Sequence, residues 1–272
     1  MYAREVTEAS KSALLELGLA LKRYHNEIVL AGGWAPYFIT KDFFPHCGSI
    51  DMDFVLQTRI MPKYDTIRKS IADLGYVAEN PFRFSRIIRS PVDGKDYEIH
   101  LDFLCEKEGS KYVDLRKVQD DLHAFVFDGL SLAFDFNFEQ KIETVLPGNG
   151  DARTTFKIAD LVGSLALKGQ ALYDRAKQKD SYDVFALTHF NGGPERAAEY
   201  FNKTVSGRRI TAENRELLKR SIAIIRDRFK NANQMGPFHV ETFTENKYNR
   251  NVVAAQVNQF LDAITATIIK TE

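Results

Sequence analysis

The residues with the clearest chemical potential are two aspartates in one apolar run. In the segment IDMDFVL, residues 50–56, Asp51 and Asp53 alternate with apolar residues. Side chains on a strand alternate between faces, so the two carboxylates share one face of an interior strand. Neighbouring carboxylates repel each other unless a cation lies between them, and carboxylate oxygens suit Mg²⁺. The pattern predicts a magnesium site; the alternative is two solvated aspartates on an edge strand.

A third carboxylate lies in the segment EIHLDFL, residues 98–104. Asp is disfavoured inside strands, so Asp102 needs a reason to be there. If this strand lies beside the first, Asp51, Asp53 and Asp102 converge and could hold two Mg²⁺ ions. Such a pair activates one oxygen and stabilises another in phosphoryl or nucleotidyl transfer. His100 falls on the face of Asp102, and we interpret it as a supporting histidine rather than a ligand.

A glycine pair precedes these acids. Gly32 and Gly33 stand where a predicted strand, residues 28–30, gives way to a predicted helix, and Asp51 follows Gly33 by 18 residues. Glycines let the backbone approach a phosphate closely, and the start of a helix offers free N–H donors. The pair is weak evidence alone, but its position ahead of the three acids points to phosphate binding.

A basic pattern follows in the second half of the chain. Lys168, Leu172, Arg175 and Lys179 have the spacing i, i+4, i+7 and i+11, which places them on one face of a continuous helix. Three cations on one face would suit a triphosphate. The alternative is a solvated basic stripe.

The first set of residues resembles a known superfamily. Gly32-Gly33, then Ser49-Ile50-Asp51-Met52-Asp53, then Asp102 are similar to the signature of the polymerase-β-like nucleotidyltransferases. The resemblance implies that the glycines and Ser49 hold the triphosphate of an NTP and that the three acids bind Mg²⁺, two ions in all. Asp102 would also be a possible base for the incoming hydroxyl.

The second segment resembles a more specific family. Residues 168–183, KGQALYDRAKQKDSYD, are similar to the helical signature of the AbiEii-type nucleotidyltransferases, which include toxins of toxin–antitoxin and phage-defence systems. The resemblance implies that Lys168 contacts nucleotide phosphates and that Asp180 and Asp183 lie in or near the active site. Together, the two resemblances cover roughly residues 28–190, and the spacing argument adds Arg175 to the nucleotide-binding residues. They imply an NTP substrate, a tRNA or other RNA acceptor and a cognate antitoxin as a partner.

Other functions stay open at this stage. The spacer between Gly33 and Asp51 is long and hydrophobic, and Trp34 stands where many superfamily members have Ser. Gly-Gly-Trp also occurs in lincosamide-type enzymes, so the acceptor could be a small antibiotic, or it could be a protein. Outside enzymes, the chain could be a nucleotide-binding interaction protein with a degenerate site. The sequence shows no hydrolase triad, Walker A loop or Rossmann fingerprint.

The elements that must position these residues change in type along the chain. Helices are predicted over residues 7–25, 34–44 and 64–74, and strands over 28–30, 50–56, 82–89, 97–105, 123–127 and 130–136. After the Pro147-Gly148-Asn149-Gly150 breaker, helical patterns cover residues 156–177, 180–190, 194–204, 211–231 and 250–270. We therefore expect an α/β (α+β) nucleotidyltransferase lobe with a mixed sheet over residues 1–150, and a helical lobe over 151–272 that completes the nucleotide and acceptor site.

The charge balance supports two lobes with different tasks. The 37 basic and 37 acidic residues cancel, but residues 1–150 hold 18 basic against 23 acidic side chains and residues 151–272 hold 19 against 14. An acidic half could gather metal cations and a basic half could hold an anion, although such imbalances also arise by chance. The basic stretch 208–230 is either an amphipathic scaffold helix or a tRNA-contacting surface. Arg83, Arg86 and Arg89 either touch a polyanion or line a surface.

The composition excludes several classes of protein. With 44% hydrophobic and 27% charged residues, the chain is that of an ordinary globular protein. No apolar window approaches the length of a membrane span, and the N-terminal residues lack a signal-peptide pattern. Cys47 and Cys105 form neither a disulfide framework nor a zinc motif. We expect a cytoplasmic protein with reduced thiols.

Overall fold

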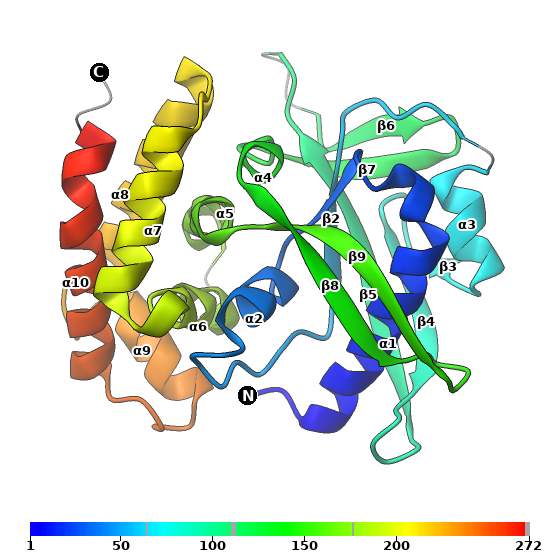
Figure 1. Ribbon diagram of the computed structural model, residues 1–272, viewed down its shortest axis with the longest axis horizontal. Coiled ribbons are helices and arrows are strands. Elements are labelled where there is room, and N and C mark those ends of the chain that lie inside the picture. Colours follow the sequence, from blue (N-terminus) through cyan, green and yellow to red (C-terminus); the bar gives the residue numbers. More distant parts are fainter. Residues whose placement is uncertain (64, 110–112, 176, 270–272) are drawn as a thin grey trace. The chain divides into compact units, whose positions relative to one another are not determined.

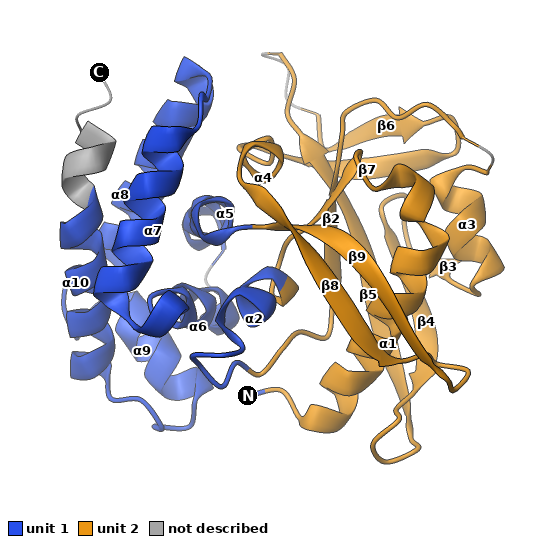
Figure 2. Ribbon diagram, in the orientation of Figure 1, with its two compact units in different colours: residues 1, 35–46, 160–272 blue, residues 2–34, 47–159 orange. Residues whose placement is uncertain are grey.

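Two compact units make up the protein. Figure 1 shows the computed structural model, which describes residues 1–63, 65–109, 113–175 and 177–269. The sheet unit comprises residues 2–34 and 47–159, and the helical unit comprises residue 1 and residues 35–46 and 160–272 (Figure 2). The chain therefore enters the helical unit early, returns to the sheet unit, and enters the helical unit again.

A mixed sheet forms the centre of the sheet unit. Its strands over the described residues are β1 Ile28–Leu30, β2 Met52–Leu56, β3 Val77–Ala78, β4 Arg83–Arg89, β5 Asp96–Glu106, β6 Leu115–Gln119, β7 Leu122–Phe127, β8 Asn137–Val145 and β9 Asp151–Ala159. The main path runs β3-β4-β5-β2-β1-β9-β8, and β7, which also pairs with β6, adds to the end of β5. The pairs β2–β5, β1–β9 and β5–β7 are parallel and the others are antiparallel.

Helix α1, Arg4–Ala20, covers one face of this sheet. It packs on β4, β5, β8 and β9 (Figure 1), and its approach is close, because a Cβ at Gly18 would lie 2.5 Å from atoms of Thr154 and Phe156. The aromatic core of the sheet includes Phe54 and Phe103, which are fully buried. Because side chains alternate along a strand, the neighbours of these phenylalanines in sequence point to the opposite face of the sheet. The unit also contains η1 Lys22–Tyr24, α3 Ile67–Asp73 and α4 Leu132–Asp135.

The helical unit packs its helices around a second aromatic core. Its elements are α2 Trp34–Thr40, which enters this unit at Ala35, α5 Leu161–Asp174, α6 Gln178–Leu187, η2 Phe190–Gly192, α7 Pro194–Gly207, α8 Ala212–Phe229, α9 Met235–Phe243 and α10 Arg250–Ile269. Phe201 and Phe260 meet edge to face with their ring centres 6.0 Å apart. Helices α5 and α8 approach closely at Gly169, where a Cβ would lie 2.5 Å from the carbonyl oxygen of Ser221. Among the helices described, none is long and apolar enough to cross a membrane.

The predicted fold class is confirmed: the protein is of mixed α/β type, with a mixed sheet and a C-terminal region of helices. The strand predicted over residues 28–30 has these bounds, and those predicted over 50–56, 82–89 and 97–105 match β2, β4 and β5 within two residues at each end. Residues 28–30 are a short run of apolar strand formers, and the other three segments combine β-branched or aromatic residues with alternation. A clear local pattern was therefore enough to locate the central strands.

The strand predicted over residues 130–136 is wrong. Residues 132–135 form helix α4 instead. The side chain of Glu106, at the end of β5, accepts hydrogen bonds from the backbone nitrogens of Gly129 (3.1 Å) and Ser131 (2.6 Å). This carboxylate fixes the turn after β7, with Gly129 at φ +84°, and the chain continues into a helical turn rather than a hairpin. The bond spans 23 residues, so local sequence does not reveal it.

The predicted boundary near residue 150 also differs from the structure. The Pro147–Gly150 segment is the turn of the β8–β9 hairpin, with Asn149 at φ +67° and Gly150 at φ +101°. Strand β9 continues to Ala159, so the helix predicted from residue 156 begins only at Leu161. Asp160 caps it by accepting hydrogen bonds from the nitrogens of Val162 and Gly163. The units divide at residue 160 because β9 still belongs to the sheet. Helix α9 was not predicted.

Candidate active site

Strands β2 and β5 bring two of the predicted acids together. They pair in parallel with Met52 opposite Leu101 and Asp53 opposite Asp102. The two aspartates therefore lie side by side on the face of the sheet away from the buried residues Met52 and Leu101. The condition set by the sequence, that the two acidic strands be neighbours, is met.

Asp51 lies one step further along the same face. It precedes β2, and its Oδ1 atom is 3.4 Å from Nδ1 of His100, while Nε2 of His100 is 3.2 Å from Oε1 of Glu79. The imidazole thus stands between two carboxylates. The side chain of Asp51 is 42% exposed, so its carboxylate remains accessible to solvent. We call Asp51, Asp53 and Asp102 the acid row.

Asp102 has a cationic partner that the sequence did not assign to it. Arg83 lies opposite Asp102 in the antiparallel β4–β5 register. Its Nε donates a hydrogen bond to Oδ1 (2.7 Å) and its Nη2 donates one to Oδ2 (2.5 Å), so both carboxylate oxygens are engaged. The side chain of Asp102 is 10% exposed. The hydrogen bond to Asp102 is the largest influence on Arg83 and raises its pKa above the ordinary value, against the lowering effect of burial; the charges of Asp102, Asp51 and Glu79 add smaller contributions in the same direction.

Gly32 makes room for Asp53. Its φ of +60° is in the left-handed region, and a Cβ there would lie 1.8 Å from Oδ2 of Asp53. The backbone nitrogen of Ala31 also donates to the carbonyl oxygen of Asp53 at 2.9 Å. The sequence suggested a glycine for access to phosphate; the structure adds that any side chain at residue 32 would occupy the position of the Asp53 carboxylate.

Trp34 explains how the glycine turn is fixed. Its indole is buried, and Nε1 donates a hydrogen bond to Oγ of Ser10 (3.2 Å), which in turn donates to the carbonyl oxygen of Ile50 (2.8 Å). Helix α1 therefore links the glycine turn to the segment that leads into β2. Gly33 is buried in this turn, and Ser49 is buried in that segment. Trp34 has a clear packing role, which accounts for its presence without reference to a ligand.

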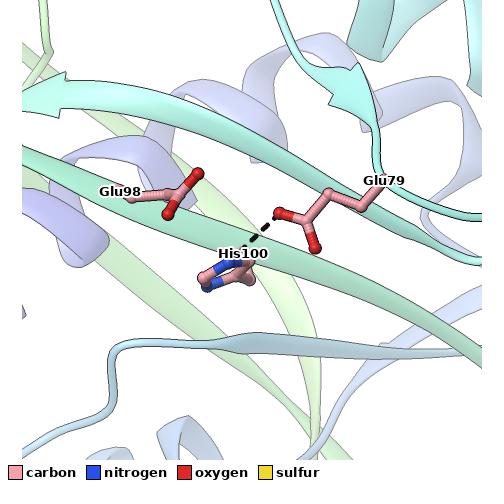
Figure 3. Close-up of side chains that lie close together, drawn as sticks. All are labelled: Glu79, Glu98 and His100. Carbon is pink, nitrogen blue, oxygen red and sulfur yellow. Dashed lines mark ion pairs between the residues drawn. The ribbon is translucent and has the colours of Figure 1, made fainter.

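The acid row fits a hard divalent cation by its donor atoms, which are carboxylate oxygens. Among the described residues, however, its three members do not form a group of ligand atoms within 4.8 Å of one another; Arg83 holds Asp102 and His100 contacts Asp51. Among the residues that the structure describes, a group of three ligand atoms within 4.8 Å of one another is formed by Glu79, Glu98 and His100 (Figure 3). Binding of one ion by the acid row would require these side chains to move.

The second predicted set lies in the helical unit, but not on one helix. Helix α5 ends at Asp174, and Arg175 is extended with φ −148° and ψ 151°. Helix α6 begins only at Gln178. The prediction that Lys168, Arg175 and Lys179 share one helical face is therefore wrong. The break between the helices turns the chain so that α6 packs against α5.

Lys168 reaches two aspartates of α6 across this break. Its Nζ is 2.8 Å from Oδ1 of Asp180, to which it donates, and 2.6 Å from Oδ2 of Asp183. Its side chain is 7% exposed. Burial alone would lower the pKa of Lys168, but the two carboxylates outweigh it and raise the pKa. Burial would likewise raise the pKa values of both aspartates, yet their cationic partners, Lys168 first, lower them.

Three further side chains complete this buried ion network. Arg175 donates through Nε to Oδ2 of Asp180 (2.9 Å), and Lys179 donates to Asp183. His46, from the segment after α2, is buried with Nε2 3.0 Å from Oδ1 of Asp183. Burial, reinforced by the charge of Lys179, lowers the pKa of His46 to about 4. No local sequence pattern indicates this role of His46, because it is 137 residues away from its partner.

The structure therefore gathers the predicted residues into two groups. The sheet unit brings together Gly32, Asp51, Asp53 and Asp102, with Gly33 and Ser49 in the adjoining segments; the helical unit brings together Lys168, Arg175, Asp180 and Asp183. The residues that sequence reasoning missed are Arg83 as the partner of Asp102 and His46 as the partner of Asp183.

Comparisons with known proteins give distant similarities of fold. No protein-family model matches the chain, and no curated protein matches it. Among solved structures, it is similar to JHP933 from Helicobacter pylori, with 11% identity over 99% of this chain and 96% of the other, and a TM-score of 0.47. A candidate nucleotidyltransferase from H. pylori has 12% identity over 100% and 99%, and a TM-score of 0.44. MenT4, a nucleotidyltransferase toxin from Mycobacterium tuberculosis, has 14% identity over 99% and 89%, and a TM-score of 0.38.

Proposed function

We propose that the protein is a Mg²⁺-dependent nucleotidyltransferase that moves an NMP group from an NTP to an acceptor hydroxyl and releases pyrophosphate. The observation that carries this proposal is the β2–β5 register, which places Asp53 beside Asp102 while Gly32 closes over Asp53. Two aspartates in register on neighbouring strands repel each other; Arg83 compensates Asp102, and a divalent cation that bridges the pair would compensate both carboxylates.

Each residue of the acid row has a role in this proposal. Asp51 and Asp53 hold the metal, and Asp102 acts as third ligand and accepts the proton of the acceptor hydroxyl. Bound Mg²⁺ supplies electrostatic stabilisation of the charge that develops on the phosphoryl oxygens. Gly32, Gly33 and Ser49 bind the phosphates, since this turn has no bulky side chain to keep the triphosphate away.

The buried ion network forms the second part of the proposal. Lys168, Arg175, Asp180 and Asp183 form a nucleotide-binding group of the helical unit, in which the cations Lys168 and Arg175 counter phosphate charge. The network holds three cations against two carboxylates, and Arg175 is the member most open to solvent, with its side chain 50% exposed. A phosphate would find a site of net positive charge there.

For the acceptor we propose RNA, with tRNA as the first candidate. Helix α8 buries Leu218, Ile222 and Ile225 and carries basic residues on its remaining surface. Arg220 on α8 lies over the ring of Tyr173 on α5, with 5.4 Å between the guanidinium carbon and the ring centre, and this ring is 61% exposed. An exposed aromatic ring beside an arginine is suited to stacking with bases of single-stranded RNA.

Labelled NTP provides the test. The protein is incubated with α-labelled NTPs, Mg²⁺ and total RNA, and the products are separated by size. We expect a labelled tRNA-sized band that disappears with the Asp53→Asn variant and with EDTA. If protein or a small molecule is labelled instead, RNA is not the acceptor. If no acceptor is labelled, the proposed nucleotidyltransferase activity is wrong.

The biological role we propose is that of a toxin in a bacterial toxin–antitoxin system, as the resemblance of residues 168–183 to the AbiEii type suggests. Induced expression of the parent chain in a bacterial host should then arrest growth, and the Asp53→Asn variant should not. Co-expression of the neighbouring gene should restore growth if that gene encodes the antitoxin. Normal growth with the parent chain at equal protein levels would contradict the toxin role.

A further inference from the structure

Arg83 stands out because its partner is a predicted metal ligand. The guanidinium takes both oxygens of Asp102 in a two-point contact, and Asp102 lies in register with Asp53. The side chain of Arg83 is 35% exposed, so it can reach solvent from this position. A cation of the chain thus occupies both oxygens of a carboxylate that the proposed metal ion would need.

Because of this contact, Arg83 and a divalent metal ion compete for the carboxylate of Asp102. A divalent ion and a guanidinium on the same carboxylate repel each other, and each weakens the binding of the other. The negative charge of Asp51 and Glu79 near Arg83 adds to the attraction that holds the guanidinium in the acid row. Without NTP, a metal ion must therefore bind a carboxylate whose charge Arg83 has already neutralised, which weakens its binding.

A triphosphate offers Arg83 an alternative partner. Phosphate oxygens accept two parallel hydrogen bonds from a guanidinium in the same geometry as a carboxylate does. An NTP that takes over Arg83 would release Asp102 for the metal, and a metal that takes over Asp102 would release Arg83 for the NTP. By thermodynamic linkage, the two ligands then strengthen each other's binding.

We propose that Arg83 is a triphosphate-binding residue that is held by Asp102 when no nucleotide is bound, and that its transfer couples the binding of NTP and metal. This inference rests on the proposed function. It predicts opposite effects of one substitution: loss of Arg83 weakens NTP binding and strengthens metal binding in the absence of NTP. A purely structural ion pair would not give this combination.

The experiment measures Mn²⁺ and NTP separately. Mn²⁺ binding is followed by electron paramagnetic resonance without nucleotide, and binding of a non-hydrolysable NTP analogue by calorimetry with and without Mn²⁺. For Arg83→Gln we expect Mn²⁺ affinity to rise about tenfold and NTP affinity to fall at least about tenfold. The strengthening of NTP binding by Mn²⁺ should shrink, and the part that remains comes from direct contact between the metal ion and the phosphates.

Matched variants make the result specific. Arg89→Gln removes the same charge from the same face of β4, six residues from Arg83, and should leave both affinities within about twofold of the parent, because the charge lost is distant and exposed to solvent. If Arg83→Gln does not fold, Arg83→Lys serves as the test variant, since one ammonium cannot bridge both oxygens of Asp102. For Arg83→Lys we expect Mn²⁺ affinity to rise and NTP affinity to fall, each by less than in Arg83→Gln. Mn²⁺ affinity that is unchanged or reduced in a folded Arg83 variant would overturn the inference.

One further variant separates this inference from the proposed function. Asp53→Asn should lose Mn²⁺ binding if the acid row holds the metal. If Asp53→Asn binds Mn²⁺ as the parent does, the proposed metal site is wrong. If Asp53→Asn loses Mn²⁺ but Arg83→Gln leaves Mn²⁺ affinity unchanged, the site stands and only the transfer of Arg83 is refuted.

Discussion

The acid row and the buried ion network use the same residue types in opposite environments. Asp51 is 42% exposed and stands at the end of a strand, whereas Asp180 and Asp183 are almost completely buried and contact lysine and arginine side chains. Buried carboxylates must be compensated by the protein itself, because burial of an unpaired charge costs several kcal/mol. In the acid row, Asp51 stays in contact with solvent and the carboxylate of Asp102 is compensated by Arg83, so the row keeps the capacity to bind an external cation when Arg83 is displaced.

This difference implies that equivalent substitutions have different consequences. In the buried ion network, removal of a charge leaves its partners uncompensated and destabilises the fold. In the acid row, removal of the charge of Asp51 or Asp53 relieves repulsion and affects ligand binding instead, whereas Asp102 is paired with Arg83. The following experiments test this contrast, from the largest expected effect to the smallest.

The largest effect is expected for Lys168→Ala. It leaves Asp180 and Asp183 buried with their principal cation removed, so the free energy of unfolding should fall by about 3–5 kcal/mol, measured by urea denaturation. Lys141→Ala is the control, because Lys141 is 55% exposed and pairs with Glu143 on the surface; it should change stability by less than about 1 kcal/mol. Equal stability of the two variants would show that the network is not structural.

His46 should make the fold sensitive to acid. Its pKa is about 4 in the folded protein against 6.5 when unfolded, so the unfolded chain takes up a proton first as the pH falls. The stabilisation is complete above pH 6.5 and is lost between pH 6.5 and 4, by about 3 kcal/mol in all. The slope of unfolding free energy against pH should be smaller in His46→Gln than in the parent, and unchanged in the control His25→Gln. A parental slope in His46→Gln would exclude this histidine as the cause.

Gly32→Ala tests the space reserved for Asp53. Both Gly32 (φ +60°) and Gly109 (φ +75°) are left-handed, but a Cβ at Gly109 meets nothing within 4 Å. The same backbone strain is therefore present in Gly109→Ala without the clash. Gly32→Ala should be less stable than Gly109→Ala by about 1–3 kcal/mol in thermal unfolding, and should bind Mn²⁺ more weakly. Equal losses of stability in the two variants would mean that the side chain of Asp53 moves aside without a measurable cost in free energy.

The smallest effect on stability is expected for Asp53→Asn. Because it removes one negative charge from the acid row, the variant should unfold within about 0.5 kcal/mol of the parent when no divalent metal is present. Addition of Mg²⁺ should stabilise the parent and not the variant, since only the native site gains ligand-binding energy. A marked loss of stability without metal would place Asp53 with the buried aspartates rather than with the acid row.

The sequence predicted the central strands and the acid row because both depend on local patterns. Alternation around Asp53 and Asp102 was enough to identify their strands, and the expectation that these strands are neighbours is met. The partners of these acids were not predictable in the same way. Arg83 shares a row with Asp102 only through the β4–β5 register, and His46 reaches Asp183 across 137 residues. Periodicity also failed at Arg175, where the break between α5 and α6 interrupts a helical pattern that the spacing alone suggests is continuous.

Residues 35–46 belong to the helical unit although they precede most of the sheet unit in the sequence, and this has a consequence for biosynthesis. Phe44 stacks on Tyr248 with 5.5 Å between ring centres, and His46 bonds to Asp183, so this segment completes its native contacts only with residues made much later. At translation rates of 5–20 residues per second, the 137 residues that separate His46 from Asp183 take about 7–27 s to synthesise. During that time, an apolar segment of the nascent chain lacks its final partners. Expression of residues 160–272 alone would likewise leave the helical unit without Phe44 and His46, so the two units cannot be separated by a single cut in the chain.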